Sequence, residues 1–404
     1  MRKAGAGALA GLALVLATGV VGTGVAASAR PAAAARLVTI TIPARHATIP
    51  STWLSYSGPP RANVLLPAGY NPHRRYPLLM LLHGLNSNYA WYAQTGLAKL
   101  FDGLRAIVVM PEGGSGWYTD WWNNGRRGDP SWETYELDDV LPAVLSRYRI
   151  RPQRRYHAIV GISMGGLGAA YLGGRLPGYF GTVASLSGFV DPEFFAPVVD
   201  PAMGLTSIAP LNGDYYLNPV DGPPNGFYMR GHNPTQLAAN LRHTRVFEAT
   251  GTGMRSSIGR AGGLVNVNAV GASAAEGGVI YPMSRLYHRA LLAAGVRVTY
   301  RQQPGGHDIP DFGNEIRALL KWGLFKRVVA HPTSWVNRTV ATGGKVWDVA
   351  YRFHRAPTQL VRFHRSGRSL SVSGAGSPVT LRVRGCVMRR PTPAVVRIPR
   401  RACH

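Results

Sequence analysis

The 404-residue sequence predicts a doubly wound α/β sheet followed by a small all-β module near the C-terminus. From Leu37 to about Val329, short apolar or β-branched runs alternate with segments of helical spacing. Beyond His331, apolar and polar residues alternate with period two and no helical pattern remains. Hydrophobic residues make up 46% of the chain and charged residues 16%, so the chain can bury a large core. Disorder of the whole chain, collagen and coiled coil are therefore excluded.

The α/β part begins with two apolar runs, bounded by Gly and Pro, that are typical of buried parallel strands. They cover Tyr76–Leu82 and Ala106–Met110. A helix is predicted over Trp132–Arg147, because its apolar residues fall on one face. The remaining predicted strands are 156–160, 182–186, 245–250 and 296–302, and the remaining helices start at Met164 or cover 281–294 and 312–324.

The N-terminus has the pattern of a secretory signal peptide. Arg2 and Lys3 precede the apolar run Leu9–Val21, and small residues at 27–29 and 33–35 fit a cleavage site. We therefore expect residues 1–35 to be removed on export to the cell envelope or medium, with an uncleaved anchor as the alternative. The mature chain is expected to contain a catalytic domain over 36–329 and a basic β-rich module over 330–404.

Positive charge is concentrated in the C-terminal module. The whole chain has 45 Lys+Arg against 19 Asp+Glu, a net charge of +26. Residues 331–404 contain 14 Lys+Arg and a single acid, Asp348, and so carry half of that net charge. An anionic cell-envelope polymer is the partner that this charge favours. A solvated, merely stabilising appendage is the alternative, and nucleic acid is not expected because an exported protein seldom meets it.

The two cysteines of the chain, Cys386 and Cys403, both lie in this module. In an exported protein a pair in one small module indicates a disulfide, worth roughly 3 kcal/mol on the chain-entropy model. Two free structural thiols are the alternative.

A candidate nucleophile lies in Gly161-Ile162-Ser163-Met164-Gly165, which has the G-x-S-x-G pattern. The pentapeptide alone is a weak signal, but here a predicted strand leads into it and a helix rich in small residues follows. A sharp strand–helix turn exposes the serine hydroxyl, and glycine on both sides lets the backbone pass without Cβ clashes. The alternative is a glycine-rich turn with a capping serine.

The serine needs a base and an acid. The base follows the last strand in chain order, which favours His307 in Pro304-Gly305-Gly306-His307. Between Gly251 and Gly306 the only carboxylate is Glu276, which we expect to hold the imidazole. Glu248 lies within a predicted strand and is the competing candidate, whereas Asp308 is too close to the histidine in sequence.

Other predicted site residues lie near the ends of strands. Backbone N–H groups of Leu85 and Met164 are the expected oxyanion donors. Five of the nine tryptophans fall between residues 91 and 132, which indicates either an aromatic rim for a substrate or ordinary packing. No metal-ligand cluster or nucleotide-binding motif occurs, so no cofactor is expected. The residues expected to contact substrate are His83, Asn86, Trp117 and Trp121.

Several motifs in this order resemble those of the mycobacterial antigen 85 mycolyltransferases and the wider esterase D-like group. The resemblance covers about residues 40–325. The motifs are Met110–Gly114, Trp117–Trp121, Trp132–Thr134, Gly161–Gly166, Ser185–Phe189 and Asn233–Gln236.

This resemblance implies an α/β-hydrolase fold and an exported Ser–Glu–His enzyme that transfers an acyl group to water or to a sugar or glycerol hydroxyl. Two departures affect the trehalose site of the mycolyltransferases. Their Asp and Arg near the oxyanion loop are replaced by His83 and Asn86, and their Trp after the histidine by Ile309. The expected function is thus a secreted serine esterase or acyltransferase. A catalytically silent protein that binds envelope polysaccharide is the alternative.

Overall fold

The computed structural model describes residues 34–403, apart from 52–53, 123–129, 196–217, 224, 255–259, 262–263 and 266. The predicted signal peptide lies almost wholly outside the described residues. Among the helices that are described, none combines the length and the apolar character that crossing a membrane requires.

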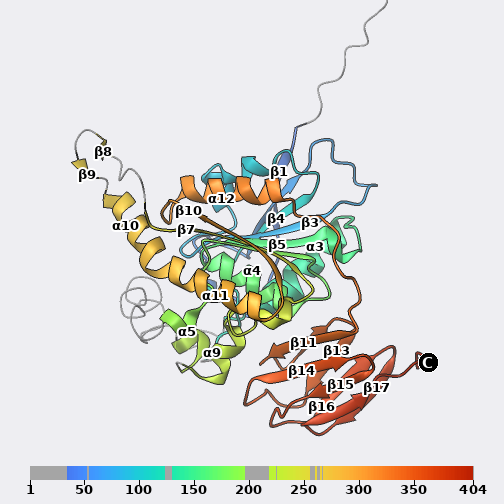
Figure 1. The fold of residues 1–404 in the computed structure, drawn as a ribbon. Helices are drawn as coiled ribbons and strands as arrows, with labels where there is room; N and C mark the ends of the chain where they lie inside the picture. Colours follow the sequence, from blue (N-terminus) through green and yellow to red (C-terminus); the bar gives the residue numbers. More distant parts are fainter. Residues whose placement is uncertain are drawn as a thin grey trace, which may run out of the picture. The chain divides into compact units, whose positions relative to one another are not determined.

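The described residues between Arg36 and Gln303 form an eight-stranded sheet of order β1-β2-β4-β3-β5-β6-β7-β10 (Figure 1). Strands β1 and β2 are antiparallel to their neighbours, and the other six run parallel. This mostly parallel sheet confirms the predicted fold class. The strands are β1 (Arg36–Thr41), β2 (Arg61–Leu66), β3 (Leu78–Leu82), β4 (Ile107–Pro111), β5 (His157–Ile162), β6 (Thr182–Leu186), β7 (Arg245–Gly251) and β10 (Arg297–Gln303).

Helices cover both faces of this sheet. Figure 1 shows α12 above the sheet and α4 and α11 below it. Because both faces are covered, β3, β4 and β5 are buried at every position, as expected of parallel strands. The helices are α1 (Trp91–Gln94), η2 (Leu97–Phe101), α2 (Trp132–Thr134), η3 (Tyr135–Val140), α3 (Leu141–Arg147), η4 (Arg154–Tyr156), α4 (Met164–Arg175), α5 (Pro192–Phe195), α8 (Asn218–Asp221), α9 (Phe227–His232), η5 (Ala238–Leu241), α10 (Val267–Ala275), η6 (Glu276–Ile280), α11 (Tyr281–Ala293) and α12 (Ile309–Trp322); a short hairpin, β8 (Arg260–Ala261) and β9 (Leu264–Val265), precedes α10.

Three helices differ from the predicted ones. The helix predicted over Trp132–Arg147 contains a π-helical segment, η3. The helix predicted from residue 281 is preceded without a break by η6 and α10, whose small residues carry little apolar periodicity. The last helix begins at Ile309, before the predicted start at 312, because Asp308 caps it and Pro310 is tolerated in a first turn.

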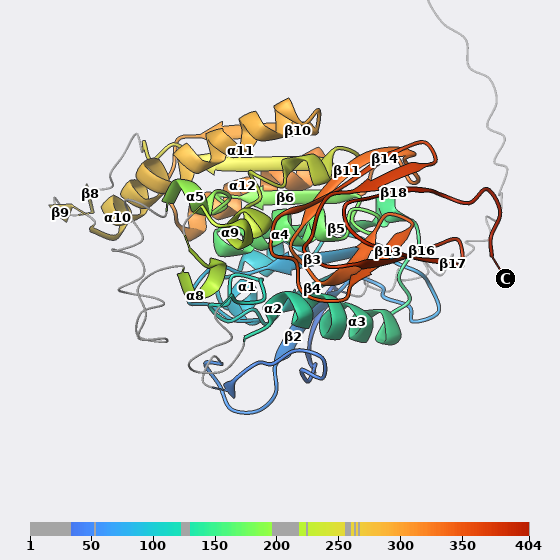
Figure 2. The ribbon, with the colours of Figure 1, turned by 90° about the horizontal axis from the view of Figure 1, so that it is seen from below.

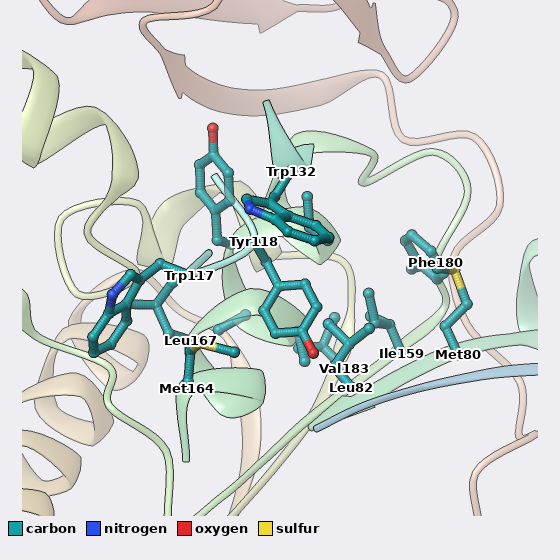
Figure 3. Close-up of a cluster of buried hydrophobic side chains, with 14 of the residues drawn as sticks. Met80, Leu82, Trp117, Tyr118, Trp132, Ile159, Met164, Leu167, Phe180 and Val183 are labelled. Atoms are coloured by element: carbon teal, nitrogen blue, oxygen red, sulfur yellow. The ribbon is translucent and has the colours of Figure 1, made fainter. Parts of the chain in front are cut away.

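The larger of the two described cores of the α/β sheet lies on the face of the sheet that α4 covers, and Figure 3 shows part of it. Leu167 of α4 packs there with Ile159 and Val183 of the neighbouring strands. Glycine at position 173 of α4 permits this close approach, since a Cβ there would lie 2.3 Å from a methyl group of Val183 on β6. Helix α4 therefore packs closely against both β5 and β6.

The C-terminal residues form two four-stranded antiparallel sheets, labelled in part in Figure 2. Their inward-facing residues share one apolar core that includes Trp335, Phe363 and Leu381. The predicted all-β character is thus confirmed. One sheet has the order β11 (Ser334–Thr339), β14 (Val361–Ser366), β15 (Ser369–Val372) and β18 (Ala394–Arg397); the other has β12 (Gly343–Val346), β13 (Val349–Phe353), β16 (Val379–Val383) and β17 (Cys386–Arg390).

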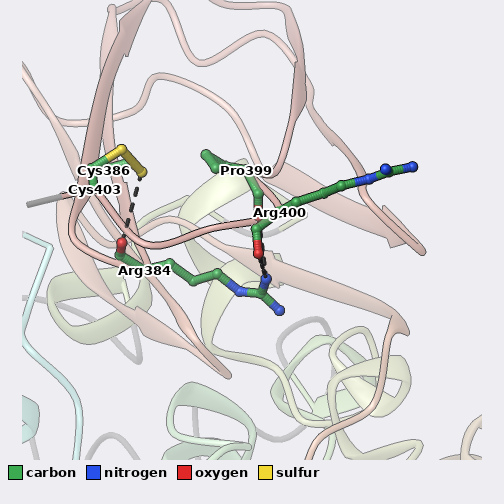
Figure 4. The surroundings of a disulfide bond; sticks show 5 residues. All are labelled: Arg384, Cys386, Pro399, Arg400 and Cys403. Atoms are coloured by element: carbon green, nitrogen blue, oxygen red, sulfur yellow. Dashed lines mark hydrogen bonds between the residues drawn. A yellow bond between two sulfur atoms is a disulfide. The ribbon is translucent and has the colours of Figure 1, made fainter.

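A disulfide joins Cys386 at the start of β17 to Cys403 near the chain end (Figure 4). The terminal segment is also held by Arg384, whose guanidinium donates 2.7 Å to the carbonyl of Arg400. The expected pairing of the two cysteines is therefore present in the structure.

Hydrogen bonds connect the β module to the end of α4. Arg175 donates to the hydroxyl of Tyr351 at 3.1 Å, and Asn337 donates to the carbonyl of Gly174 at 3.0 Å. The guanidinium of Arg154 lies 4.7 Å from the ring centroid of Trp347. The described chain from Ala34 onward accordingly forms one compact unit.

Candidate active site

Ser163 lies in the turn between β5 and α4, with φ 58° and ψ −121°. This conformation is uncommon for a residue with a side chain. Such a conformation is kept where the packing around it restricts the backbone. A Cβ at Gly161 would lie 1.9 Å from the carbonyl oxygen of Gly165. A Cβ at Gly165 would lie 2.3 Å from the carbonyl oxygen of Leu82. Both flanking glycines are therefore required by the close packing of the turn.

His307 follows β10 in the loop that leads into α12. Its Nε2 lies 2.9 Å from Oγ of Ser163. Its backbone N–H donates to the carbonyl of Ala272 at 2.8 Å, and its ring packs edge-on against Phe312, with centroids 5.0 Å apart. The side chain is 19% exposed, so a substrate can reach it from one side.

Glu276 is fully buried at the start of η6, between α10 and α11. Its Oε2 lies 2.7 Å from Nδ1 of His307. Its Oε1 accepts hydrogen bonds from Thr250 and from the backbone N–H of Gly251, each at 2.7 Å, and lies 2.8 Å from Oγ of Ser187. The carboxylate is thus oriented by neighbours on two strand ends, with one oxygen left for the histidine.

Glu248, the competing acid, is buried on β7, and its carboxylate contacts residues of α11. Its Oε1 accepts from Ser284 at 2.8 Å, and its Oε2 lies 3.8 Å from Nδ1 of His288. Burial raises the pKa of Glu248 to about 8. Asp308 caps α12 by accepting from the backbone N–H of Asp311. Of the three carboxylates considered, the structure brings only Glu276 to His307.

The two predicted oxyanion donors lie on either side of the serine. Met164 is the first residue of α4, and Leu85 follows Gly84, where an added Cβ would lie 3.4 Å from Cβ of Ser163. Among the described residues, neither amide donates a hydrogen bond to a protein acceptor. A helix N-terminus also favours negative charge, so the amide of Met164 is electrostatically suited to an oxyanion.

A pocket of about 280 Å³ opens beside these residues. Its walls are mostly apolar, so it suits the hydrocarbon or aromatic part of a ligand. Trp117 lies in the wall, where its ring is 5.0 Å from that of Phe189. The lining residues are Gly84, Leu85, Ser87, Trp91, Trp117, Ile162, Ser163, Met164, Phe189, Ala275, Val279, Ile280, His307 and Phe312.

Three of the four residues expected to contact substrate do not line this pocket. His83 is 1% exposed, and its ring is held by the carbonyl of Gly84 and the N–H of Gly113. Burial lowers the pKa of His83, so it is a neutral core histidine in place of the expected binding residue. Trp121 is also buried in the core and does not line this pocket. Asn86 is exposed on the loop surface and contacts Ser115.

Several residues around the site were not predicted from the sequence. Ser187 and Thr250 lie at the carboxyl ends of β6 and β7. Ligands and catalytic groups gather at these ends in open α/β sheets, so this position could have indicated both residues. Glu315 on α12 lies beside Ser187 and carried no such signal, because it falls in a regular amphipathic helix.

The mostly parallel sheet and the strand–serine–helix turn define a protein of α/β-hydrolase fold. The model of the esterase family, described as "Putative esterase", matches residues 55–318, and the chain belongs to this family.

Two curated relatives and one solved structure illustrate the likeness. Esterase Rv1288 of Mycobacterium tuberculosis is 30% identical over 255 residues, which is 61% of this chain and 52% of the relative. The diacylglycerol acyltransferase/mycolyltransferase Ag85A of Mycobacterium leprae is 30% identical over 205 residues, 45% of this chain and 57% of the relative. The chain therefore spans about half the length of the curated relatives it matches. The predicted resemblance to the antigen 85 group is confirmed.

The solved structure is that of MPT51 from Mycobacterium tuberculosis. Its TM-score is 0.54 at 20% identity, and the match covers 72% of this chain and 99% of that chain. At this identity the likeness concerns the fold alone.

Proposed function

We propose that this chain is a serine esterase or acyltransferase that forms an acyl-enzyme on Ser163. The observation that supports the proposal is the series of hydrogen bonds from Ser163 through His307 to Glu276, beside an apolar pocket. The order of polar contacts is the one that nucleophilic catalysis by serine requires: a nucleophile, a base within reach, and a group that orients the base.

In the first half of the reaction, Nε2 of His307 takes the hydroxyl proton while Oγ of Ser163 attacks the ester carbonyl. The negative charge that develops on the carbonyl oxygen is stabilised by the N–H groups of Leu85 and Met164. The tetrahedral intermediate then expels the alcohol, which leaves with the proton held by His307. Glu276 keeps Nδ1 protonated and stabilises the transient imidazolium.

In the second half, water or an alcohol gives its proton to His307 and attacks the acyl-enzyme. The second tetrahedral intermediate then breaks its bond to Oγ of Ser163, and His307 returns the proton to that oxygen. Water yields a free acid, and a sugar or glycerol hydroxyl yields a new ester. One relative is named an esterase and another an acyltransferase, so we propose both water and an alcohol as acceptors. The pocket of about 280 Å³ suits a short or aromatic acyl group.

The alternative is a catalytically silent protein that binds envelope polysaccharide. A fluorophosphonate probe separates the two, because it labels only a serine whose base is in place. We expect stoichiometric labelling of the wild-type chain and none of Ser163→Ala. Ester turnover should fall by about four to six decades in Ser163→Ala, as it does on removal of a triad nucleophile. A variant that keeps a tenth of the wild-type activity would contradict the proposal.

The acceptor is identified by a second assay. Esters of increasing acyl length are offered with water alone, with glycerol and with trehalose, and free acid and new ester are measured separately. A dominant new ester identifies a transferase, and a dominant free acid identifies a hydrolase.

A second candidate function is attachment of the β module to an anionic cell-envelope polymer. In the sheet β12-β13-β16-β17, Arg382 pairs with Ala350 and Val387, and Lys345 also pairs with Ala350. Residues opposite each other in antiparallel strands lie on the same face. Thr380 lies two residues from Arg382 on β16 and therefore on the same face. Arg352 and Arg389 both lie opposite Thr380, so they belong to that face as well.

These four cations are exposed, and we call them the cationic face: Lys345, Arg352, Arg382 and Arg389. The only acid of the module, Asp348, lies 2.5 Å from Arg365 and does not belong to this face. Arginine suits bidentate contact with phosphate or carboxylate. Such attachment would place an exported enzyme near envelope esters, in keeping with the predicted signal peptide.

A further inference from the structure

A second buried carboxyl group lies behind the proposed acid. Oγ of Ser187 is 2.8 Å from Oε1 of Glu276 and 2.8 Å from Oε1 of Glu315. Ser187 and Glu276 are fully buried, and Glu315 is 1% exposed. A serine hydroxyl has one hydrogen, and an ionised carboxylate can only accept. If both glutamates were ionised, one of the two short contacts would contain no hydrogen.

The neighbours of each carboxyl group indicate which one carries the proton. Glu276 faces His307 and accepts from Thr250 and Gly251, and these donors favour its charged form. In the described part of the chain, Oε1 of Glu315 contacts Ser187 and its Oε2 has no hydrogen-bond partner.

The charged groups around Glu315 also favour its neutral form. Glu276 faces it from η6, and Asp311 lies one turn earlier on its own helix, α12. Burial, and secondly the charge of Glu276, raise the pKa of Glu315 well above its usual range.

We propose that Glu315 is a protonated positioning residue for the acid of the site. Its carboxyl O–H donates to Oγ of Ser187, and the hydroxyl of Ser187 donates in turn to Oε1 of Glu276. The inference rests on the proposed function, since it assigns Glu276 as the group that orients His307.

This chain of donors has two consequences. It completes the hydrogen bonds to Oε1 of Glu276, so that Oε2 alone is directed at the histidine. It also keeps a second negative charge away from the imidazole, although another carboxyl group is buried nearby. Helix α12 then supports the site twice, because Oδ2 of Asp311 accepts from the backbone N–H of Gly306 at 2.7 Å, next to His307.

The proposal is tested with Glu315→Gln and Glu315→Leu in the full chain. The amide of Gln can donate to Ser187 as a protonated carboxyl does, and it carries no charge at any pH. Leu has a similar volume and no donor. With a small soluble ester, we expect Glu315→Leu to lower kcat by about 10- to 100-fold with little change in KM, because misplacement by a fraction of an ångström is costly. Glu315→Gln should restore kcat to within a few-fold of wild type.

The pH profile measures the charge of Glu315 directly. The acidic limb of kcat/KM reports the free enzyme's base. If Glu315 is already neutral, the midpoint of that limb is the same in wild type and in Glu315→Gln. A midpoint that falls by a full pH unit in Glu315→Gln would show that the variant removed a negative charge, and would overturn the proposal. Equal activity of the Gln and Leu variants would overturn the positioning role.

One readout does not depend on activity. Infrared difference spectra of wild type against Glu315→Gln, at neutral pH, should contain the C=O band of a protonated carboxyl group. Loss of a carboxylate band instead would refute the protonated state, whether or not the chain turns over esters. A failure of the proposed function itself would appear differently, as absence of fluorophosphonate labelling in the wild-type chain.

Discussion

Glu276 and His307 are 31 residues apart in sequence, and Oε2 of the first lies 2.7 Å from Nδ1 of the second. The contact forms because β7 and β10 are parallel neighbours, so the segments that follow them meet at one edge of the sheet. The π-helical segment η6 places the carboxylate at this edge, and the loop after β10 places the imidazole. Four predictions follow from this arrangement and from the rest of the fold.

The choice of acid is tested by comparing two buried glutamates. Glu276→Gln should lower kcat by about 10²- to 10⁴-fold, because an amide in place of the carboxylate favours the wrong histidine tautomer. Glu248→Gln is the matched control, and its turnover should stay close to that of wild type. Turnover of a small ester by both purified variants decides the matter. An inactive Glu248→Gln beside an active Glu276→Gln would reverse the assignment.

Glu248 should make the stability of the protein depend on pH. Its pKa is raised by burial to about 8 in the folded chain, against about 4.3 for an unfolded glutamate. A raised carboxyl pKa stabilises the folded state fully below the unfolded value, and this stability is lost as pH rises towards the folded value. Ionising the buried Glu248 lowers the free energy of unfolding, and Glu248→Gln cannot ionise. The stability of Glu248→Gln relative to wild type should therefore grow between pH 4 and pH 8.

The size of this effect follows from linkage. One proton contributes about 1.4 kcal/mol per pH unit within the window, so at pH 7 the penalty is on the order of 3 kcal/mol. Urea unfolding at pH 4.5 and pH 7 measures the difference, with the exposed Asp102→Asn as control. An advantage of Glu248→Gln that is equal at both pH values would show that folding does not raise the pKa of Glu248.

The turn at Ser163 should not tolerate a larger residue at Gly165. A Cβ at Gly165 would lie 2.3 Å from the carbonyl oxygen of Leu82, in the rigid backbone of β3. Gly165→Ala should therefore destabilise the fold by about 1–3 kcal/mol, as overpacking does, and displace the nucleophile. Melting temperature and the rate of fluorophosphonate labelling should both fall.

Gly271→Ala is the matched control for this substitution. Gly271 lies in helix α10 with no atom within 4 Å of an added Cβ, so alanine should be neutral or stabilise by up to about 1 kcal/mol. Wild-type labelling by Gly165→Ala would show that the turn can relax and that its glycine is not required.

The cationic face is tested by neutralising it in the full chain. The β module is hydrogen-bonded to α4 through Arg175 and Asn337, so substitution disturbs the catalytic domain less than truncation would. The variant replaces Lys345, Arg352, Arg382 and Arg389 with Gln. Its sedimentation with isolated cell walls should be weak, whereas wild-type binding should be strong at low salt and fall steeply as salt screens the charges.

Cleavage of a small soluble ester serves as the control for this experiment. It should be equal in the two proteins, because none of the four residues lines the pocket. Wild-type binding that does not respond to salt, or equal binding by the neutralised variant, would exclude an electrostatic attachment.

The sequence by itself determined the order of the strands, the fold class and which three residues to consider as nucleophile, base and acid. Runs such as Leu78–Leu82 are apolar throughout because both faces of a parallel strand are buried, so the pattern is readable without a structure. The glycines around Ser163 are also readable from a short stretch of sequence, since the sharp turn itself requires them. Ser163 and His307 could be singled out because each follows a strand, and Glu276 because it is the only carboxylate between Gly251 and Gly306.

Only the tertiary structure decided which side chains meet. His83 and Trp121 were expected at the substrate and are buried in the core, because burial depends on what packs above a loop and not on the loop's own sequence. Glu315 lies in an ordinary amphipathic helix, and its contact with Ser187 spans 128 residues. Such contacts are set by how helices dock on the sheet, a non-local property that no short stretch of sequence contains.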